Sequence, residues 1–189
     1  MKALLIITLQ NDFCSFGNAE VDAADNLVEL ANRIMPFFDK VVAVNFSFPP
    51  NHSSFAANHL FRQPGKSMLI NGRTQLLKAI HCVEGSYGAE FPTGLNRQKI
   101  DFIQKVGTDS VRDVYSIFRD LDCNDNELSA YLKSEGIISL YFMGIGGLFF
   151  ENSLAEAQQK GFKVLFIQDA TVNEFNYLIA ESISIDEIH

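Results

Sequence analysis

Short runs of apolar residues that end in polar residues or glycine recur along the chain, and they constrain the fold more than any other feature. The clearest are Ala3 to Leu9, which runs into Gln10-Asn11-Asp12, and Ile137 to Met143, which runs into Gly144. A run whose side chains are all apolar is typical of a strand buried on both faces, as in a parallel sheet. Further strands are predicted at Val41 to Asn45, Lys99 to Val106, and Lys163 to Ile167, the last closed by Asp169.

Helical patterns separate these runs. Asp22 is predicted to cap a first helix, and Asn124 or Asp125 to cap a second that ends near Gly136. A third helix should follow Gly144-Ile145-Gly146-Gly147 and end near Gly161. The apolar positions of the first two helices are Leu27, Leu30, Ala31, Ile34 and Phe38, then Leu128 and Leu132.

Strands that alternate with helices predict an α/β protein with a mainly parallel sheet covered by helices on both faces. Ligands of such folds bind beyond the carboxyl ends of the strands. A functional site is therefore expected after Leu9, Asn45, Val106 and Met143.

Residues 46–97 show no sustained periodicity and are predicted to form a long excursion of loops. They hold too many apolar residues for a solvated tether, so we expect one domain over residues 1–189.

Composition excludes several classes of protein. Hydrophobic residues make up 47% and charged residues 20%, which excludes general disorder. A net charge of -8 argues against binding to nucleic acid or to an anionic membrane. The longest uncharged stretch, residues 136–150, is shorter than the ~18 residues of a membrane span. The chain has three cysteines, Cys14, Cys82 and Cys123, and they are widely spaced. An odd number at this spacing indicates neither a disulfide framework nor a zinc module, and it favours a protein of the reducing cytoplasm.

Five segments in order carry a family resemblance. They are ALLIITLQNDFC (3–14), PPNHSSFA (49–56), HCVEGSYGAEF (81–91), GTD (107–109) with Asp113 and YSIF (115–118), and GIG (144–146). Together they resemble the isochorismatase-like cysteine hydrolases, and among them the nicotinamidases. The resemblance implies a Rossmann-like sheet of about six strands. It also implies amide hydrolysis through a cysteine thioester, with an aspartate base, a lysine, and a metal held by an aspartate and histidines.

The positions that match this machinery carry other residues. Thr8 stands at the aspartate position, Val106 at the lysine position and Phe150 at the cysteine position. Lys105 adjoins Val106, but neighbouring side chains of a strand point to opposite faces. Phe46 and Phe48 match the metal aspartate and the first metal histidine, while His52 and His81 match the remaining histidines.

Two interpretations of the remaining histidines are open. His52 and His81, joined by His59, would form a metal site, or they are hydrogen-bonded remnants of one. Two imidazoles without a carboxylate make a poor site for a hard cation, so we expect no metal and no other cofactor. We expect instead that Phe46 and Phe48 point the same way and fill the former metal site, with Phe150 on the opposite wall and Thr8 and Val106 on the floor.

Cys14 is either a substitute nucleophile or inert, and Cys82 is interpreted as structural. Reactivity needs an electropositive setting, and none is predicted around Cys14. The glycines at 144–147 also suggest a phosphate-binding turn, but Phe149 stands where the third glycine of G-x-G-x-x-G belongs. The family's oxyanion turn explains these glycines better, and in that family the peptide bond matching Ile145–Gly146 is commonly cis.

The leading hypothesis is a catalytically inactive nicotinamidase-like homologue that acts by binding a small ligand or a protein partner. The alternatives are a divergent amide hydrolase with a rebuilt site and a purely structural subunit, and a homo-oligomer is also open. The predicted pocket residues are Thr8, Phe13, Phe46, Phe48, His52, His81, Val106, Ile145, Gly146 and Phe150.

Overall fold

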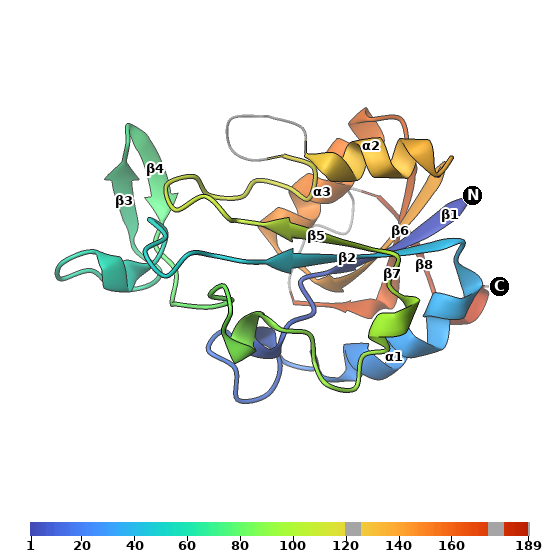
Figure 1. Cartoon of the computed structure of the whole chain (residues 1–189), viewed down its shortest axis with the longest axis horizontal. Helices are drawn as coiled ribbons and strands as arrows, with labels where there is room; N and C mark the ends of the chain where they lie inside the picture. Colours follow the sequence, from blue (N-terminus) through green and yellow to red (C-terminus); the bar gives the residue numbers. More distant parts are fainter. Residues whose placement is uncertain (120–125, 174–179, 189) are drawn as a thin grey trace.

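A six-stranded sheet, with every neighbouring pair parallel, runs through the centre of the molecule (Figure 1). The computed structural model describes residues 1–119, 126–173 and 180–188. The strand order is β5-β2-β1-β6-β7-β8, which confirms the predicted α/β class with about six strands. The strands are β1 (Lys2–Ile7), β2 (Lys40–Phe46), β5 (Phe102–Val106), β6 (Ser139–Ile145), β7 (Lys163–Val172) and β8 (Glu181–Ile183).

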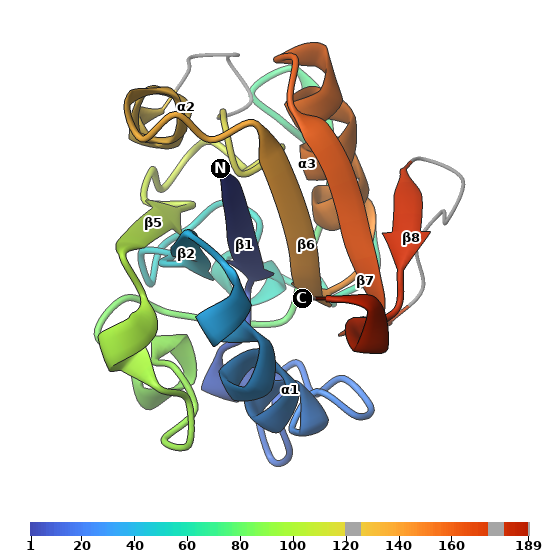
Figure 2. The same cartoon turned by 90° about the vertical axis from the view of Figure 1, so that its right-hand side faces the viewer.

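Three helices cover the two faces of the sheet. Helix α1 (Asn26–Ile34) lies on one face, and α2 (Glu127–Ser134) and α3 (Leu148–Gln159) lie on the other, as the view along the strands shows (Figure 2). Successive side chains of β1 point to opposite faces of the sheet, so the strand contributes to a separate hydrophobic core on each face. Leu4 and Ile6 pack with the α1 side, and Leu5 and Ile7 with the α2–α3 side.

The helix caps differ from those predicted. Helix α1 begins at Asn26, so Asp22 does not cap it, and the side chain of Asp25 makes no capping hydrogen bond either. The Asp25 carboxylate instead accepts hydrogen bonds from Ser15, which lower its pKa. Asn126 caps α2 by accepting a hydrogen bond from the backbone N–H of Leu128. Asn124 and Asp125 lie outside the described residues.

Strand β7 is longer than predicted and continues past Asp169 to Val172. A shift in register between Phe142 and Gly144 lets β6 and β7 stay paired over this added length. The Asp169 carboxylate accepts hydrogen bonds from the Ser184 hydroxyl and the Ile185 N–H, so it ties down the chain after β8 and does not end β7.

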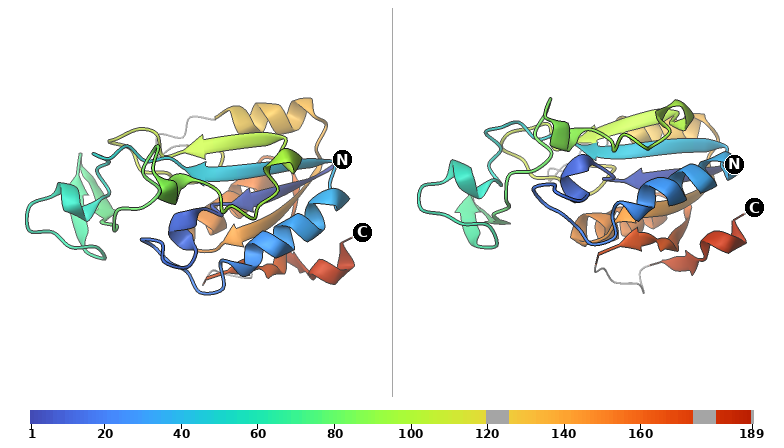
Figure 3. Two further views of the ribbon diagram at one scale, coloured as in Figure 1. Left: turned by 60° about the horizontal axis from the view of Figure 1, so that its bottom comes forward. Right: turned by 90° about the horizontal axis from the view of Figure 1, so that it is seen from below.

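The excursion at 46–97 contains a hairpin that periodicity did not predict. Strands β3 (Ser67–Ile70) and β4 (Arg73–Leu76) pair antiparallel around Asn71 and Gly72, both of which have positive φ. An Asn-Gly pair suits such a tight turn because both residues adopt this conformation readily. The hairpin projects beyond the carboxyl ends of the parallel strands, away from both chain termini (Figures 1 and 3).

Short 3-10 turns complete the described structure. They are Asn11–Phe13, Met35–Phe37, Ala56–Asn58, Tyr87–Ala89, Arg97–Lys99 and Ile185–Glu187. None of the helices in the described ranges has the length and apolar character needed to cross a membrane.

The first turn of α3 offers a matched pair for testing the core. Phe150 is fully buried and contacts Phe142 edge-on, whereas Leu148 is 72% exposed. We expect Phe150→Ala to lower the free energy of unfolding by ~3–5 kcal/mol, because a large buried ring leaves a cavity. Leu148→Ala should change it by less than ~0.5 kcal/mol. Urea denaturation measures both, and equal effects would contradict this packing.

Candidate functional site

Polar side chains after β1 position the segments around the carboxyl ends of the strands. The Gln10 amide donates to the Phe46 and Ala89 carbonyls and accepts from the Phe46 N–H, each at 2.8 Å. Asn11 donates to the Tyr87 carbonyl at 2.8 Å. Gln10 is completely buried and Asn11 nearly so. This network fixes the end of β2 and the segment around 87–90 against the end of β1.

Asp12 continues this network through its carboxylate. One oxygen accepts the Cys82 N–H at 2.6 Å and the other the Asn18 N–H at 3.2 Å. Gly88 lies so close that a Cβ there would be 2.1 Å from the Asp12 carboxylate. Asp12 therefore has a structural role, and it holds the segment that contains His81 in place.

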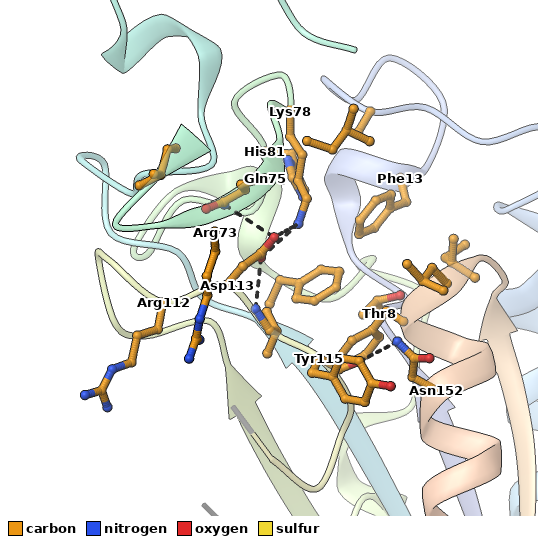
Figure 4. Close-up of a pocket in the computed structure, with 18 of the residues that line it drawn as sticks. Thr8, Phe13, Arg73, Gln75, Lys78, His81, Arg112, Asp113, Tyr115 and Asn152 are labelled. Atoms are coloured by element: carbon orange, nitrogen blue, oxygen red, sulfur yellow. Dashed lines mark hydrogen bonds and ion pairs between the residues drawn. The ribbon is translucent and has the colours of Figure 1, made fainter. Parts of the chain in front are cut away.

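A cavity of about 890 Å³ opens at the carboxyl ends of the strands (Figure 4). Six predicted pocket residues line it: Thr8, Phe13, Phe46, His81, Ile145 and Gly146. The hairpin β3–β4, residues 111–115 and the start of α3 supply other walls. The cavity is open, whereas the sequence favoured a pocket filled by phenyl rings.

Four predicted pocket residues do not line this cavity. They are Phe48, His52, Val106 and Phe150, all buried at 6% exposure or less. Phe48 packs on Gly107, where an added Cβ would be 2.4 Å from the ring, and its centroid is 4.8 Å from that of His52 and 5.2 Å from that of His81. Phe46 stacks on Phe48 with centroids 5.0 Å apart, so the two rings do lie side by side, with Phe46 facing the cavity.

Phe149, and not Phe150, faces the cavity at the start of α3. Its ring centroid is 4.9 Å from that of Phe46, while Phe150 packs into the core between the sheet and α3. The physical reason is burial, because the core on that face accepts a whole phenyl ring beside Phe142. Val106 belongs to the same core. The peptide bonds in the described part of the chain are all trans, including Ile145–Gly146, which the resemblance made a candidate for a cis bond.

The histidines do not form a metal site. His52 donates from Nε2 to the Arg112 carbonyl and accepts at Nδ1 from Ser54, so both ring nitrogens are engaged. His81 donates from Nδ1 to the Ala79 carbonyl at 2.8 Å, and His59 donates to the Ser53 carbonyl. Within the described ranges, no group of three or more His, Cys, Asp or Glu side chains is placed to hold a metal ion. The donor set therefore does not fit the metal that the resemblance implies.

The cavity also has no reactive thiol among the described residues. Burial, reinforced by the charge of Asp25, raises the pKa of Cys14 to about 11. Burial and the charge of Asp12 raise the pKa of Cys82 still further. Neither thiol lines the cavity, and Cys123 lies outside the described residues. The thiolate that a cysteine hydrolase needs is thus disfavoured at both described positions.

An ion pair that sequence reasoning missed lies on the cavity wall. Lys78 Nζ is 2.9 and 3.0 Å from the two Asp113 carboxylate oxygens, which also accept hydrogen bonds from Gln75 and the Val114 N–H (Figure 4). Lys78 Nζ is also 5.8 Å from the centre of the Phe48 ring. One signal was available in the sequence, because Lys78 lies three residues before His81, in a stretch without acidic residues between Asp39 and Glu84.

Acidification is expected to destabilise the fold through His52 and His81. Burial is the main cause that lowers the pKa of both below the ordinary value of 6.5, so the unfolded chain binds these protons at higher pH than the folded chain. This stabilisation is fully present above about pH 6.5 and is lost as the pH falls from there toward the folded pKa values.

The urea midpoint should therefore fall between about pH 7 and about pH 5. His81→Phe should flatten this dependence, because a phenyl ring keeps the aromatic contacts and does not titrate. An unchanged slope in this variant would show that His81 is not one of the groups responsible.

Comparisons with known proteins agree with this architecture. The family model described as the isochorismatase domain matches residues 2–176. A nicotinamidase of Acinetobacter baylyi is 35% identical over 144 residues, covering 76% of this chain and 67% of the relative. One of Escherichia coli is 32% identical over 174 residues, covering 89% and 81%. A solved Acinetobacter baumanii structure, titled nicotinamidase pyrazinamidease, superposes with a TM-score of 0.90 at 28% identity, covering 100% of this chain and 98% of that one.

The order of the parallel strands, the segments gathered at their carboxyl ends and these similarities lead to one assignment. The chain belongs to the isochorismatase family, and within it resembles the nicotinamidases.

Proposed function

We propose that this chain is a non-catalytic nicotinamidase-like homologue that binds a small ligand in the cavity at the carboxyl ends of the strands. Amide hydrolysis by a cysteine hydrolase needs a nucleophile, a base and groups that stabilise charge, acting as a unit. The matching positions carry Phe150, Thr8 and Val106, which supply neither a thiol nor a carboxylate nor an ammonium group.

The placement of Phe150 is the observation that carries this proposal. Its side chain is fully buried in the core between the sheet and α3, away from the cavity. The position that would hold the nucleophile is therefore committed to packing. A return of catalysis would require both a new side chain and a new orientation of this turn.

The cavity favours a small ligand over a protein partner. Its volume of about 890 Å³ lies in the range of small-molecule sites, ~300–1,000 Å³. Aromatic walls with a few polar groups are also typical of such sites. Phe13, Phe46 and Phe149 supply the walls here, and Lys78, Asp113 and His81 the polar groups.

A divergent hydrolase is the second candidate, because those three polar side chains share one cavity. The Asp113 carboxylate is already engaged by Lys78 Nζ through both of its oxygens, and it also accepts hydrogen bonds from Gln75 and the Val114 N–H. These contacts favour a binding role for the cluster.

The purified protein should release no ammonia from nicotinamide or pyrazinamide above a blank, and Phe150→Cys should not change this. The introduced thiol would lie in the core, without a base or a lysine beside it. The Escherichia coli relative serves as the positive control. Elemental analysis should find no stoichiometric zinc, iron or manganese. Turnover that Lys78→Met abolishes would establish the divergent hydrolase instead.

Binding can be followed with a tryptophan introduced into the cavity wall, because the chain has no tryptophan of its own. We expect Phe149→Trp to show a saturable fluorescence change with nicotinamide, nicotinate or larger aromatic amides and acids. Phe37→Trp is the matched control, since Phe37 is exposed and does not line the cavity. Absence of a saturable change with every compound would contradict ligand binding in this cavity.

A further inference from the structure

We infer that the ligand of this cavity is an aromatic anion larger than a single ring, recognised by the ammonium group of Lys78; this inference rests on the proposed ligand-binding function. Three features of the cavity favour such a ligand: the charge of its wall, the fixed position of the Lys78 ammonium group, and the size and aromatic character of its apolar walls.

The cavity wall is cationic although the chain as a whole is acidic. The chain carries a net charge of -8. The charged side chains that line the cavity are Arg73, Lys78 and Arg112 against the single carboxylate of Asp113. Arg112 Nε also lies 3.7 Å from a carboxylate oxygen of Asp109, which is outside the lining, so with Asp109 counted the wall carries one net positive charge. A wall of this sign attracts an anion and repels a metal cation.

The hairpin and its flanks supply this charge. No Asp or Glu occurs between Asp39 and Glu84, while Arg62, Lys66, Arg73 and Lys78 all lie on the excursion around β3 and β4. Of these, Arg73 and Lys78 line the cavity. The hairpin β3–β4 and its flanks, which form the cavity wall away from the sheet, therefore contain no acidic residues.

Asp113 fixes the position of the Lys78 ammonium group, but it does not occupy every N–H group of that ammonium. Both carboxylate oxygens lie within 3.0 Å of Lys78 Nζ, and the side chains are 31% and 16% exposed. A lysine ammonium has three N–H groups, so it can donate to a ligand while it stays bonded to Asp113. The Asp113 oxygens are also bonded to Gln75 and the Val114 N–H, which reduces their attraction for a second cation.

The Lys78 ammonium also lies near both histidines of the former metal site. Its charge is one of the causes, after burial, that lower the pKa of His52 and of His81. The Lys78 ammonium group therefore provides positive charge close to where the resemblance places a metal.

The remaining walls suit flat apolar groups. The aromatic side chains that line the cavity are Phe13, Phe46, Phe149 and Tyr115. The Phe46 and Phe149 rings are in contact, with centroids 4.9 Å apart, and form one continuous aromatic surface. An aromatic ring packs well against such a surface. A volume of about 890 Å³ exceeds what a single six-membered ring requires, so a second ring would bury additional apolar surface.

The test compares acids with their uncharged amides. The probes are 2-naphthoate and 2-naphthamide, with nicotinate and nicotinamide as the single-ring pair, measured on the full chain by calorimetry. We expect 2-naphthoate to bind about tenfold more tightly than 2-naphthamide, as a charge-assisted hydrogen bond allows. It should also bind more tightly than nicotinate. Equal or tighter binding of 2-naphthamide, or of the single-ring acid, would overturn the inference.

Variants of Lys78 test whether this residue causes the tighter binding of the acid than of the amide. Lys78→Gln should abolish the preference for the acid, and Lys78→Arg should keep it because the charge remains. Lys66→Gln is the matched control, since Lys66 is exposed on the same excursion but does not line the cavity. If Lys78→Gln does not fold, the acid-to-amide ratio of the unmodified protein still decides. A loss of preference in Lys66→Gln equal to that in Lys78→Gln would also overturn the assignment.

The outcomes separate the two proposals. Binding of amides in preference to acids, reported by the Phe149→Trp variant, would refute the anion inference and leave the ligand-binding function standing. Binding of none of the four probes at millimolar concentration would refute the anion inference and count against the function proposed for this cavity as well.

Discussion

The buried amides of Gln10 and Asn11 and the carboxylate of Asp12 hold the carboxyl ends of the strands in one arrangement. They bond to Phe46 at the end of β2, and to Tyr87, Ala89 and Cys82 in the loop segment that carries His81. A buried polar group without a partner is costly, so this network specifies its partners closely. The contacts lie under the cavity, and none of Gln10, Asn11 and Asp12 lines it.

This separation explains how the cavity can change its chemistry while the fold remains. Phe46 and Phe48 stand where the resemblance places metal ligands; their rings stack on each other, and Phe48 contacts His52 and His81 edge-to-face. Phe48 is fully buried, and such a ring stabilises the fold by ~1.5–3 kcal/mol. Thr8 keeps a positive φ of 52°, a conformation that a β-branched residue adopts at a cost of ~1–3 kcal/mol. The hydrogen bond from the Thr8 N–H to the Val44 carbonyl helps to impose this conformation.

The sequence predicted the parallel sheet because its strands are continuous apolar runs, as in Ile137 to Met143. The family resemblance placed Thr8, Phe46 and His81 in one pocket, and all three line the cavity. The hairpin β3–β4 was missed because its signal is a local Asn71-Gly72 turn and not a period. The choice between Phe149 and Phe150 depends on how the first turn of α3 packs on Phe142. Adjacent phenylalanines give no basis for that choice before the core is known.

The ion pair of Lys78 and Asp113 shows a different limit of prediction. The two residues are 35 positions apart, and each belongs to a loop region without periodicity. Their pairing depends on the path of the excursion, which Asp12 fixes from the other side through Cys82. A metal site needs several donors with free lone pairs, and such a site is lost when one or two ligands change. An ion pair between one lysine and one carboxylate, in contrast, fixes the position of a positive charge with only two side chains. A cavity whose described donor set does not fit a metal ion can in this way hold a centre of positive charge.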